Sequence, residues 1–152
     1  GETPAAGRRV VSMGDFHGDF DLAVEALTAL GFLRDGAWAG GDAVLVQTGD
    51  VVDRGDDGKS LWELLFRLQD EAPKSHGRVE LLLGNHELLR MQGDNRYATQ
   101  ADLQSFGGPA ADHEAWAVTG AIGRELRRRG KVAAIVEGAV YSHAGLLPEV
   151  LD

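Results

Sequence analysis

The sequence predicts a single α/β domain, because short apolar runs alternate with longer amphipathic segments along the chain. A length of 152 residues suits one domain with a core and is too small for two full domains. Hydrophobic residues make up 43% and charged residues 26%, which is typical of a folded protein rather than a disordered one. We therefore expect residues 1–152 to fold as one unit.

The first half of the chain is predicted to hold three strands and two helices. Leucines recur at helical spacing in the segments that we assign to helices, and Pro73 limits the second of these. The expected elements are a strand at residues 10–13, a helix that begins near Asp19 and ends before Gly31, a strand at 43–48, a helix at 59–69 and a strand at 79–83.

The second half is more polar and is predicted to hold one long helix and a hairpin. The glycines and proline at 107–109 mark its clearest break. The expected elements are a helix at 112–128, interrupted by Gly120 and Gly123, and a hairpin with strands at 131–136 and 139–142.

Charge and composition exclude several classes of protein. The net charge of -9, from 24 acidic and 15 basic residues, argues against non-specific nucleic-acid binding. The arginines at 127–129 fit the last turn of a helix, where cations complement the helix dipole. Because cysteine is absent, any metal must be held by oxygen and nitrogen ligands. The apolar runs, such as those at 44–46 and 81–83, are far too short to span a membrane.

The start of the chain says little about the cellular location. It begins at Gly1 rather than Met, and its first residues contain no apolar signal core. A soluble protein of the cytoplasm or of an organelle is the favoured expectation, while the compartment and the oligomeric state stay undetermined by the sequence.

Four motifs at strand ends carry the residues that are suited to chemistry. They are GDFHG at 14–18, GDVVDRG at 49–55, GNHE at 84–87 and SHAG at 142–145. In open α/β sheets, ligands bind beside the carboxyl ends of the strands. We therefore expect Asp15, Asp50 and Asn85 to lie close together.

Asp15 and His17 are candidate ligands of one metal ion. They lie two residues apart, so both side chains can face one cation in an extended turn. A carboxylate with an imidazole suits manganese, iron or zinc better than calcium. The alternative is that Asp15 caps the helix that begins near Asp19, beside a solvated His17.

Asp50 is a candidate bridge between two metal ions, because one carboxylate can bind two cations about 3.5–4 Å apart. Arg54 follows closely and offers a planar, permanently charged group for phosphate oxygens. The alternatives are that Asp50 is a turn or cap residue and that Asp53 and Arg54 form a surface ion pair.

Asn85, His86 and His143 complete the set of candidate residues. The Asn85 amide oxygen can bind a metal, and His86 beside it is available for acid catalysis. Each histidine alone could be a solvated or turn residue, but four such motifs at strand ends are improbable as independent turns. His76 and His113 lie outside the pattern and are expected at the surface.

The motifs resemble those of the calcineurin-like metallophosphoesterases, and the Asp53-Arg54-Gly55 ending resembles the phosphoprotein phosphatase branch. The Shewanella-like protein phosphatases are the most similar group. This narrower resemblance rests on GDVVDRGDD at 49–57, LGNHELL at 83–89, GDNRY at 93–97 and HAGLLP at 143–148. It implies a β-sandwich flanked by helices and a metal-dependent phosphomonoesterase, a protein phosphatase for phosphotyrosine or phosphoserine and phosphothreonine. The implied partner is a phosphorylated protein or peptide.

The resemblance also implies a set of metal ligands. Asp15 and His17 would hold the first ion, Asp50 would bridge both ions, and Asn85 and His143 would hold the second. The ions would be divalent or trivalent, with manganese expected before iron or zinc. A hydroxide that bridges them would attack the phosphorus in line, without a phosphoenzyme.

The catalytic roles follow from the same resemblance. His86 would protonate the leaving oxygen, with Asp53 orienting its ring. Arg54 would bind the phosphoryl oxygens, and Asn85 would also contact the phosphate.

The sequence departs from the family pattern after His143. Family members normally supply a further metal-binding histidine and a phosphate-binding arginine there, yet the chain ends at Asp152. We therefore expect the C-terminal part of the fold to be absent from this chain and the second metal site to be incomplete within it. Two alternatives stay open: a diadenosine polyphosphate hydrolase, which the SHAG motif also suits, and a non-catalytic metal-binding domain.

Overall fold

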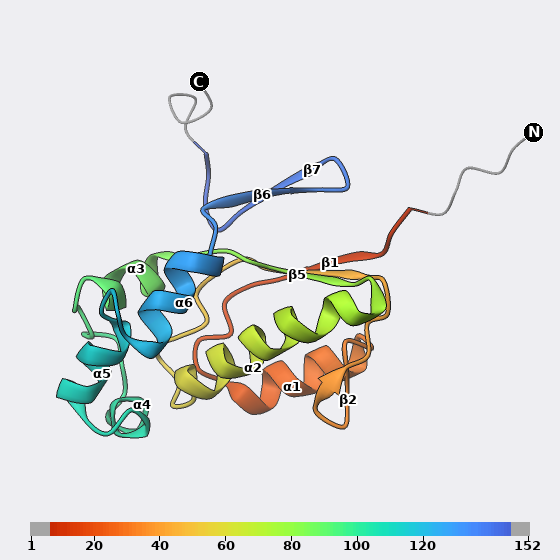
Figure 1. The fold of residues 1–152 in the computed structure, drawn as a ribbon. Coiled ribbons are helices and arrows are strands. Elements are labelled where there is room, and N and C mark those ends of the chain that lie inside the picture. Colours follow the sequence, from red (N-terminus) through yellow and green to blue (C-terminus); the bar gives the residue numbers. More distant parts are fainter. Residues whose placement is uncertain (1–6, 147–152) are drawn as a thin grey trace, which may run out of the picture.

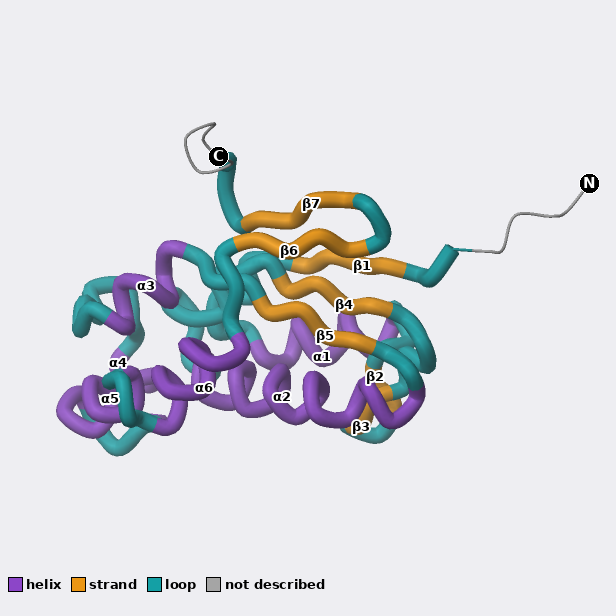
Figure 2. The backbone as a smooth tube through the Cα atoms, turned by 45° about the horizontal axis from the view of Figure 1, so that its top comes forward, coloured by secondary structure: helices purple, strands orange, loops and turns teal. Residues whose placement is uncertain are grey.

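The structure, a computed structural model, describes residues 7–146 and consists of three layers. A parallel sheet forms the middle layer, two long helices cover one face of it, and a β-hairpin lies on the other face (Figures 1 and 2). The α/β prediction is confirmed. Sheets on both sides of a shared apolar layer, with helices outside, also agree with the expected sandwich.

The central sheet brings the ends of its strands to one edge. Its strands run in the order β1, β4, β5, and the pairing is parallel throughout. Met13, Gln47 and Leu81 lie in register at the carboxyl ends, so the motifs that follow leave the sheet at one level. The strands are β1 (Val10–Met13), β4 (Val44–Gln47) and β5 (Arg78–Leu81).

Two amphipathic helices, α1 (Phe20–Ala29) and α2 (Gly58–Glu71), pack their apolar faces against the sheet. Asp19 caps α1, since its side chain accepts a hydrogen bond from the Leu22 amide at 3.0 Å. Both helices were predicted. A short 3₁₀ turn, η1 (Ala72–Ser75), and a small hairpin of β2 (Leu33–Arg34) and β3 (Ala37–Trp38) were not.

The main core lies between this sheet and these helices. Its largest fully buried members include Trp62 of α2, Phe32 after α1 and Trp116, which comes from a helix later in the chain. Burying side chains of this size contributes roughly 1.5–3 kcal/mol each. The apolar contact therefore fixes the sheet edge from which the polar motifs emerge.

Four short helices follow the sheet, namely α3 (Asn85–Met91), α4 (Gln100–Ser105), α5 (Pro109–Trp116) and α6 (Ala121–Arg129). The predicted helix at 112–128 is two helices: the interruption predicted at Gly120 is confirmed, and the one predicted at Gly123 was wrong. The chain turns between α5 and α6, and a side chain at Gly120 would collide with the Glu114 carbonyl, as one at Gly123 would with Trp116. The two glycines therefore let the helices meet closely, and Gly123 lies inside α6.

The hairpin of β6 (Ala133–Val136) and β7 (Ala139–Ser142) is the predicted one, and its first strand begins two residues later than expected. Glu137 and Gly138 both have positive φ, which suits a two-residue turn between twisted strands. The inner face of the hairpin buries Ala134 and Val136 against the sheet.

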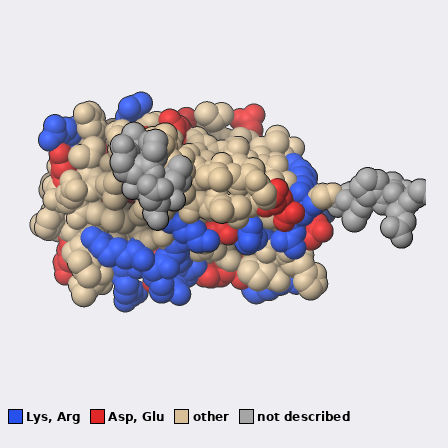
Figure 3. All heavy atoms as spheres, turned by 90° about the horizontal axis from the view of Figure 1, so that it is seen from above, with Lys and Arg blue, Asp and Glu red and all other residues tan. Residues whose placement is uncertain are grey.

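The outer surface of the hairpin is seen in Figure 3, where uncharged side chains cover the middle and positive ones gather along one side. The arginines at 127–129 occupy the last turn of α6, as predicted. His76 and His113 are exposed, also as predicted. Among residues 7–146, no helix is both long and apolar enough to cross a membrane.

Candidate metal centre

The first two motifs are joined by backbone hydrogen bonds at the sheet edge. The amides of Asp15, His17 and Gly18 donate to the carbonyls of Gly49, Asp50 and Val51 at 3.1, 3.0 and 2.8 Å, respectively. The loops after β1 and β4 therefore continue side by side beyond the sheet. This pairing brings together side chains that are 35 residues apart in the sequence.

The backbone of these loops is unusual. Five candidate site residues have positive φ: Asp15 (54°), His17 (45°), Asp50 (56°), Asp53 (70°) and Arg54 (69°). This region is uncommon for residues other than glycine, although aspartate and histidine enter it more readily than most. The surrounding hydrogen bonds hold the two loops in this conformation at the edge of the sheet.

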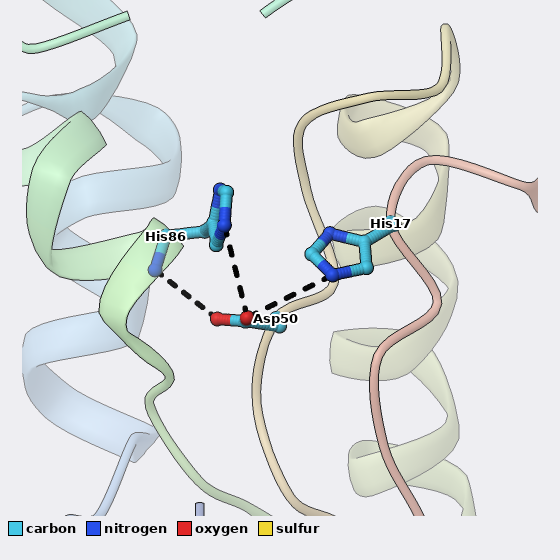
Figure 4. A group of neighbouring side chains, drawn as sticks. All are labelled: His17, Asp50 and His86. Atoms are coloured by element: carbon cyan, nitrogen blue, oxygen red, sulfur yellow. Dashed lines mark hydrogen bonds and ion pairs between the residues drawn. The ribbon is translucent and has the colours of Figure 1, made fainter. Parts of the chain in front are cut away.

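Asp50 lies at the centre of two groups of possible metal ligands. One group joins Asp50 with His17 and His86, and the other joins it with Asp15 and His143. Figure 4 shows the Asp50 carboxylate between the rings of the first group. Among the described residues, Asp15 and His17 thus fall into different groups, whereas the family resemblance assigned them to one ion.

The histidine tautomers leave nitrogen lone pairs facing Asp50. The Nδ1 of His17 lies 3.0 Å from the Val52 carbonyl, and the Nδ1 of His143 lies 2.9 Å from the Thr48 carbonyl. A carbonyl can only accept, so each Nδ1 must donate. In the neutral rings Nε2 then carries the lone pair, which is the usual arrangement of a metal-binding histidine.

The side chains assigned to the second ion bring their electron-rich atoms close to one another. His143 Nε2 lies 3.1 Å from Asn85 Oδ1 and 3.5 Å from Asp50 Oδ1. With the proton of His143 on Nδ1, these three atoms repel one another unless a cation lies among them. Nitrogen and oxygen donors around a shared carboxylate fit a two-metal centre.

The alternative readings of Asp15 and Asp53 are wrong. Asp19, rather than Asp15, caps α1. Asp53 is fully buried and pairs with His86 and Arg90, so it does not form a surface pair with Arg54. Asp50 does accept a hydrogen bond from the His86 amide at 3.1 Å, but its second oxygen faces the histidines.

His86 and Asp53 form a buried pair beside Asp50. The Nδ1 of His86 lies 2.8 Å from an Asp53 oxygen, while its Nε2 lies 3.9 Å from Asp50. Tyr97 packs near the His86 ring, with centroids 5.1 Å apart, and its own ring is 49% exposed. The imidazole is thus held on one side and faces the candidate metal centre on the other.

Arg54 lies at the rim of the site. Its backbone amide donates to the Tyr97 carbonyl at 2.9 Å, which ties the two loops together, and the residue is exposed. Within residues 7–146, no carboxylate pairs with its guanidinium. A cation held this way is free to meet an anionic ligand.

Glu87 holds the backbone of the site through hydrogen bonds, a role that the sequence did not reveal. It is fully buried and accepts hydrogen bonds from the amides of Asp50, Val51 and Gly84 at 2.8, 2.9 and 2.8 Å. Burial raises the pKa of the Glu87 carboxyl, and these backbone donors oppose the shift. Glu87 thereby connects the loop after β4 to the loop after β5.

Arg90 was also missed. It is buried, and it pairs with Asp53, Asp102 and Asp112. Arg90 lies four residues after His86 and therefore on the same face of α3. A sequence prediction of this helix would have placed the two side chains together.

A family model described as calcineurin-like phosphoesterase matches residues 8–138, which is most of the chain. The chain belongs to the calcineurin-like phosphoesterase family. Its fold is that of the calcineurin-like metallophosphoesterases, and the family implies a site for divalent metal ions, for which the two groups around Asp50 are the candidates.

Relatives by sequence include an uncharacterised protein of Schizosaccharomyces pombe, 40% identical over 92% of this chain and 44% of that protein. Shewanella-like protein phosphatase 2 of Arabidopsis thaliana is 37% identical over 64% of this chain and 25% of its own length. Shewanella-like protein phosphatase 1 of Plasmodium berghei is 31% identical over 91% of this chain and 39% of its own length. The predicted resemblance to this group is confirmed.

A solved structure agrees with this assignment. The cold-active protein-tyrosine phosphatase of a psychrophilic Shewanella species superimposes with a TM-score of 0.83, at 29% identity, over 95% of this chain and 44% of that one. This calcineurin-like chain thus spans less than half the length of the relatives that it matches.

Proposed function

We propose that this chain carries the metal-binding and acid-catalytic part of a phosphoprotein phosphatase, a metal-dependent phosphomonoesterase. One observation carries the proposal: the buried His86–Asp53 pair faces two groups of metal ligands that share Asp50. A purely metal-binding domain has no use for a buried acid directed at the metals.

The proposed metal ligands keep the assignment implied by the family resemblance: Asp15 and His17 for one ion, Asp50 for both, and Asn85 and His143 for the other. Asp15 and His17 fall into different groups around Asp50, so the proposal requires both side chains to turn toward one ion when it binds. Manganese is the proposed metal, with iron or zinc as alternatives that suit the same nitrogen and oxygen donors. When bound, two such cations supply an acidified water and neutralise phosphate charge.

The remaining groups act on the substrate. Arg54 binds the phosphoryl oxygens through its free guanidinium, and Asn85 contacts the phosphate beside it. His86 carries a proton on Nε2 to the leaving oxygen, while Asp53 holds the opposite nitrogen at 2.8 Å. Asp53 also stabilises the ring while it is cationic, as a buried carboxylate does for a neighbouring imidazole.

Phosphotyrosine is the proposed substrate residue. Tyr97 is partly exposed and its ring lies beside His86, so an aromatic leaving group that receives a proton from His86 can stack on it. A protein-tyrosine phosphatase among the similar structures supports the same choice.

The test uses the protein expressed from its full reading frame and loaded with manganese. We expect hydrolysis of a phosphotyrosyl peptide in preference to a phosphoseryl peptide and to diadenosine tetraphosphate. His86→Ala should lower kcat about 10²–10⁴-fold while the metal content stays near that of the parent protein. The exposed His113 provides the matched control, and His113→Ala should leave kcat unchanged.

Three results would count against the proposal. A preference for the dinucleotide would favour the diadenosine polyphosphate hydrolase. One metal per chain without turnover would favour a binding domain. Loss of metal in His86→Ala would mean that His86 is a ligand rather than an acid.

A further inference from the structure

A buried ion network connects the His86–Asp53 pair to helices that lie beyond the metal centre. Arg90 is at its middle, with a side chain that is 0% exposed. Because α3 places His86 and Arg90 one turn apart on one face, both side chains reach Asp53 from the same helix. Figure 1 shows α3, α4 and α5 together at one end of the sheet.

Each oxygen of Asp53 has its own partner. One lies 2.8 Å from His86 Nδ1, and the other accepts from Arg90 Nη1 at 2.7 Å. The orientation of the carboxylate plane is therefore set by Arg90 as much as by His86. If Arg90 were lost, Asp53 could rotate and the imidazole would no longer have a fixed acceptor.

The short helices α4 and α5 hold Arg90 in turn. Asp102 of α4 accepts from Arg90 Nη1 at 2.9 Å, and Asp112 of α5 accepts from Nη2. Phe106 and Trp116 lie against the guanidinium, with ring centroids 5.6 and 5.0 Å from its central carbon. Only a planar cation with several donors fits such a site.

The network is anchored to the core and charged. The second oxygen of Asp102 accepts from the Gly58 amide, at the start of α2, at 3.0 Å. Burial opposes the charge of Arg90, but hydrogen bonds to Asp102 and Asp53 and the nearby negative charges raise its pKa above the usual value. Arg90 therefore remains a cation.

We propose that Arg90 is a positioning residue for phosphoester hydrolysis, which fixes the Asp53 carboxylate and through it the His86 imidazole, and that α4 and α5 serve to hold Arg90. The inference rests on the proposed function, since it assumes that His86 donates a proton to the leaving group. It assigns a role in the reaction to helices that contribute no ligand to the metal centre.

The test compares two substrates that differ in leaving group, phenyl phosphate and p-nitrophenyl phosphate. A positioned acid matters more for the poorer leaving group, phenoxide, because nitrophenoxide departs more readily without a proton. The manganese-loaded protein from the full reading frame is assayed as parent, His86→Asn and Arg90→Lys. The activity of His86→Asn should be lower by about 10²-fold or more on phenyl phosphate and by much less on p-nitrophenyl phosphate.

Arg90→Lys keeps the charge but cannot reach all three carboxylates at once. We expect its loss on phenyl phosphate to exceed its loss on p-nitrophenyl phosphate by about tenfold, in line with partial loss of acid catalysis. The control is Arg129→Lys, because Arg129 also pairs with carboxylates and lies over an aromatic ring, but its partners belong to α2 and α6 and do not include Asp53 or His86. The ratio of its activities on phenyl phosphate and p-nitrophenyl phosphate should match the ratio of the parent.

An equal loss on both substrates would overturn the role of Arg90 while leaving the proposed function in place. Absence of turnover in the parent protein would refute the proposed function itself. If Arg90→Lys does not fold, Asp112→Asn replaces it. That substitution weakens one contact of Arg90 at the far end of the network, and it should change the ratio in the same direction.

A proton spectrum of the zinc-loaded protein gives a second readout. The His86 Nδ1 proton, bound to Asp53, should give a low-field signal in the parent and in Arg129→Lys. Arg90→Lys should shift or broaden that signal. An unchanged signal in folded Arg90→Lys would overturn the inference regardless of activity.

Discussion

Two arginines of this chain each bind several carboxylates, and these carboxylates differ in their exposure to solvent. Arg90 meets three carboxylates where the side chain is 0% exposed. Arg129, whose side chain is 15% exposed, pairs with Glu125 of α6 and with Asp70 of α2, and the Asp70 side chain is 64% exposed. Both arginines also lie over aromatic rings.

The difference shows that similar contacts can have different consequences. Buried carboxylates cannot lose their cation without leaving charges in a medium of low polarity, whereas water and salt can replace the cation beside an exposed carboxylate such as Asp70. The network around Arg90 therefore fixes the position of Asp53 and His86, whereas the network around Arg129 mainly adds a little stability. Four predictions test this contrast.

The largest effect is expected for Arg90→Met. Removal of the cation leaves Asp53, Asp102 and Asp112 buried without their partner, which should lower the free energy of unfolding by about 3–5 kcal/mol. Urea denaturation, followed by circular dichroism, measures the change. A loss below about 1 kcal/mol, the size typical of surface pairs, would remove the distinction between the two networks.

Glu87→Gln should have the next largest effect. Glu87 is as buried as Arg90 but its partners are three backbone amides, so the substitution turns a donor toward one of them. An unsatisfied buried amide should cost about 1–3 kcal/mol of unfolding free energy in the same denaturation experiment. A neutral result would mean that burial matters only where both partners are charged.

Arg129→Met should cost no more than about 1 kcal/mol, because solvent screens the exposed Asp70. Its denaturation midpoint should also approach that of the parent as salt is added. Loss on the scale of Arg90→Met would show that the network around Arg129 is a structural support.

The smallest effect is a pH dependence from Glu125. Hydrogen bonds from Arg128 and Arg129 lower the pKa of Glu125 from 4.5 to about 2. Because the folded pKa lies below the unfolded one, the stabilisation is present above pH 4.5 and is lost as the pH falls toward 2. The parent should therefore lose more stability than Glu125→Gln over this acid range. Parallel curves for the two proteins would contradict the assignment.

The sequence predicted the sheet and the place of the metal centre for a physical reason. Strands β1, β4 and β5 are short apolar runs, and their carboxyl ends in a parallel sheet must share an edge. The convergence of Asp15, Asp50 and Asn85 followed from that rule. The hairpin was equally visible, because Glu137-Gly138 is a turn sequence between apolar strands.

The short helices were harder to predict because their buried faces are partly ionic. Asp102, Arg90 and Asp112 occupy positions where periodicity analysis looks for apolar residues. Helix α3 begins inside the GNHE motif, so residues that read as a catalytic loop are also its first turn. The roles of Glu87 and Arg90 depend on partners far along the chain, which spacing alone does not reveal.

The left-handed backbone of the metal loops has a consequence for the choice of residues. At Asp15, His17, Asp50, Asp53 and Arg54, glycine would satisfy the backbone better than the residue present. Backbone conformation alone would therefore favour glycine at the positions that we propose as metal ligands, as the partner of the acid and as the phosphate-binding arginine. At these positions the backbone and the proposed chemistry make different demands, and at Asp53 the buried pairs with His86 and Arg90 offset the cost of the backbone conformation.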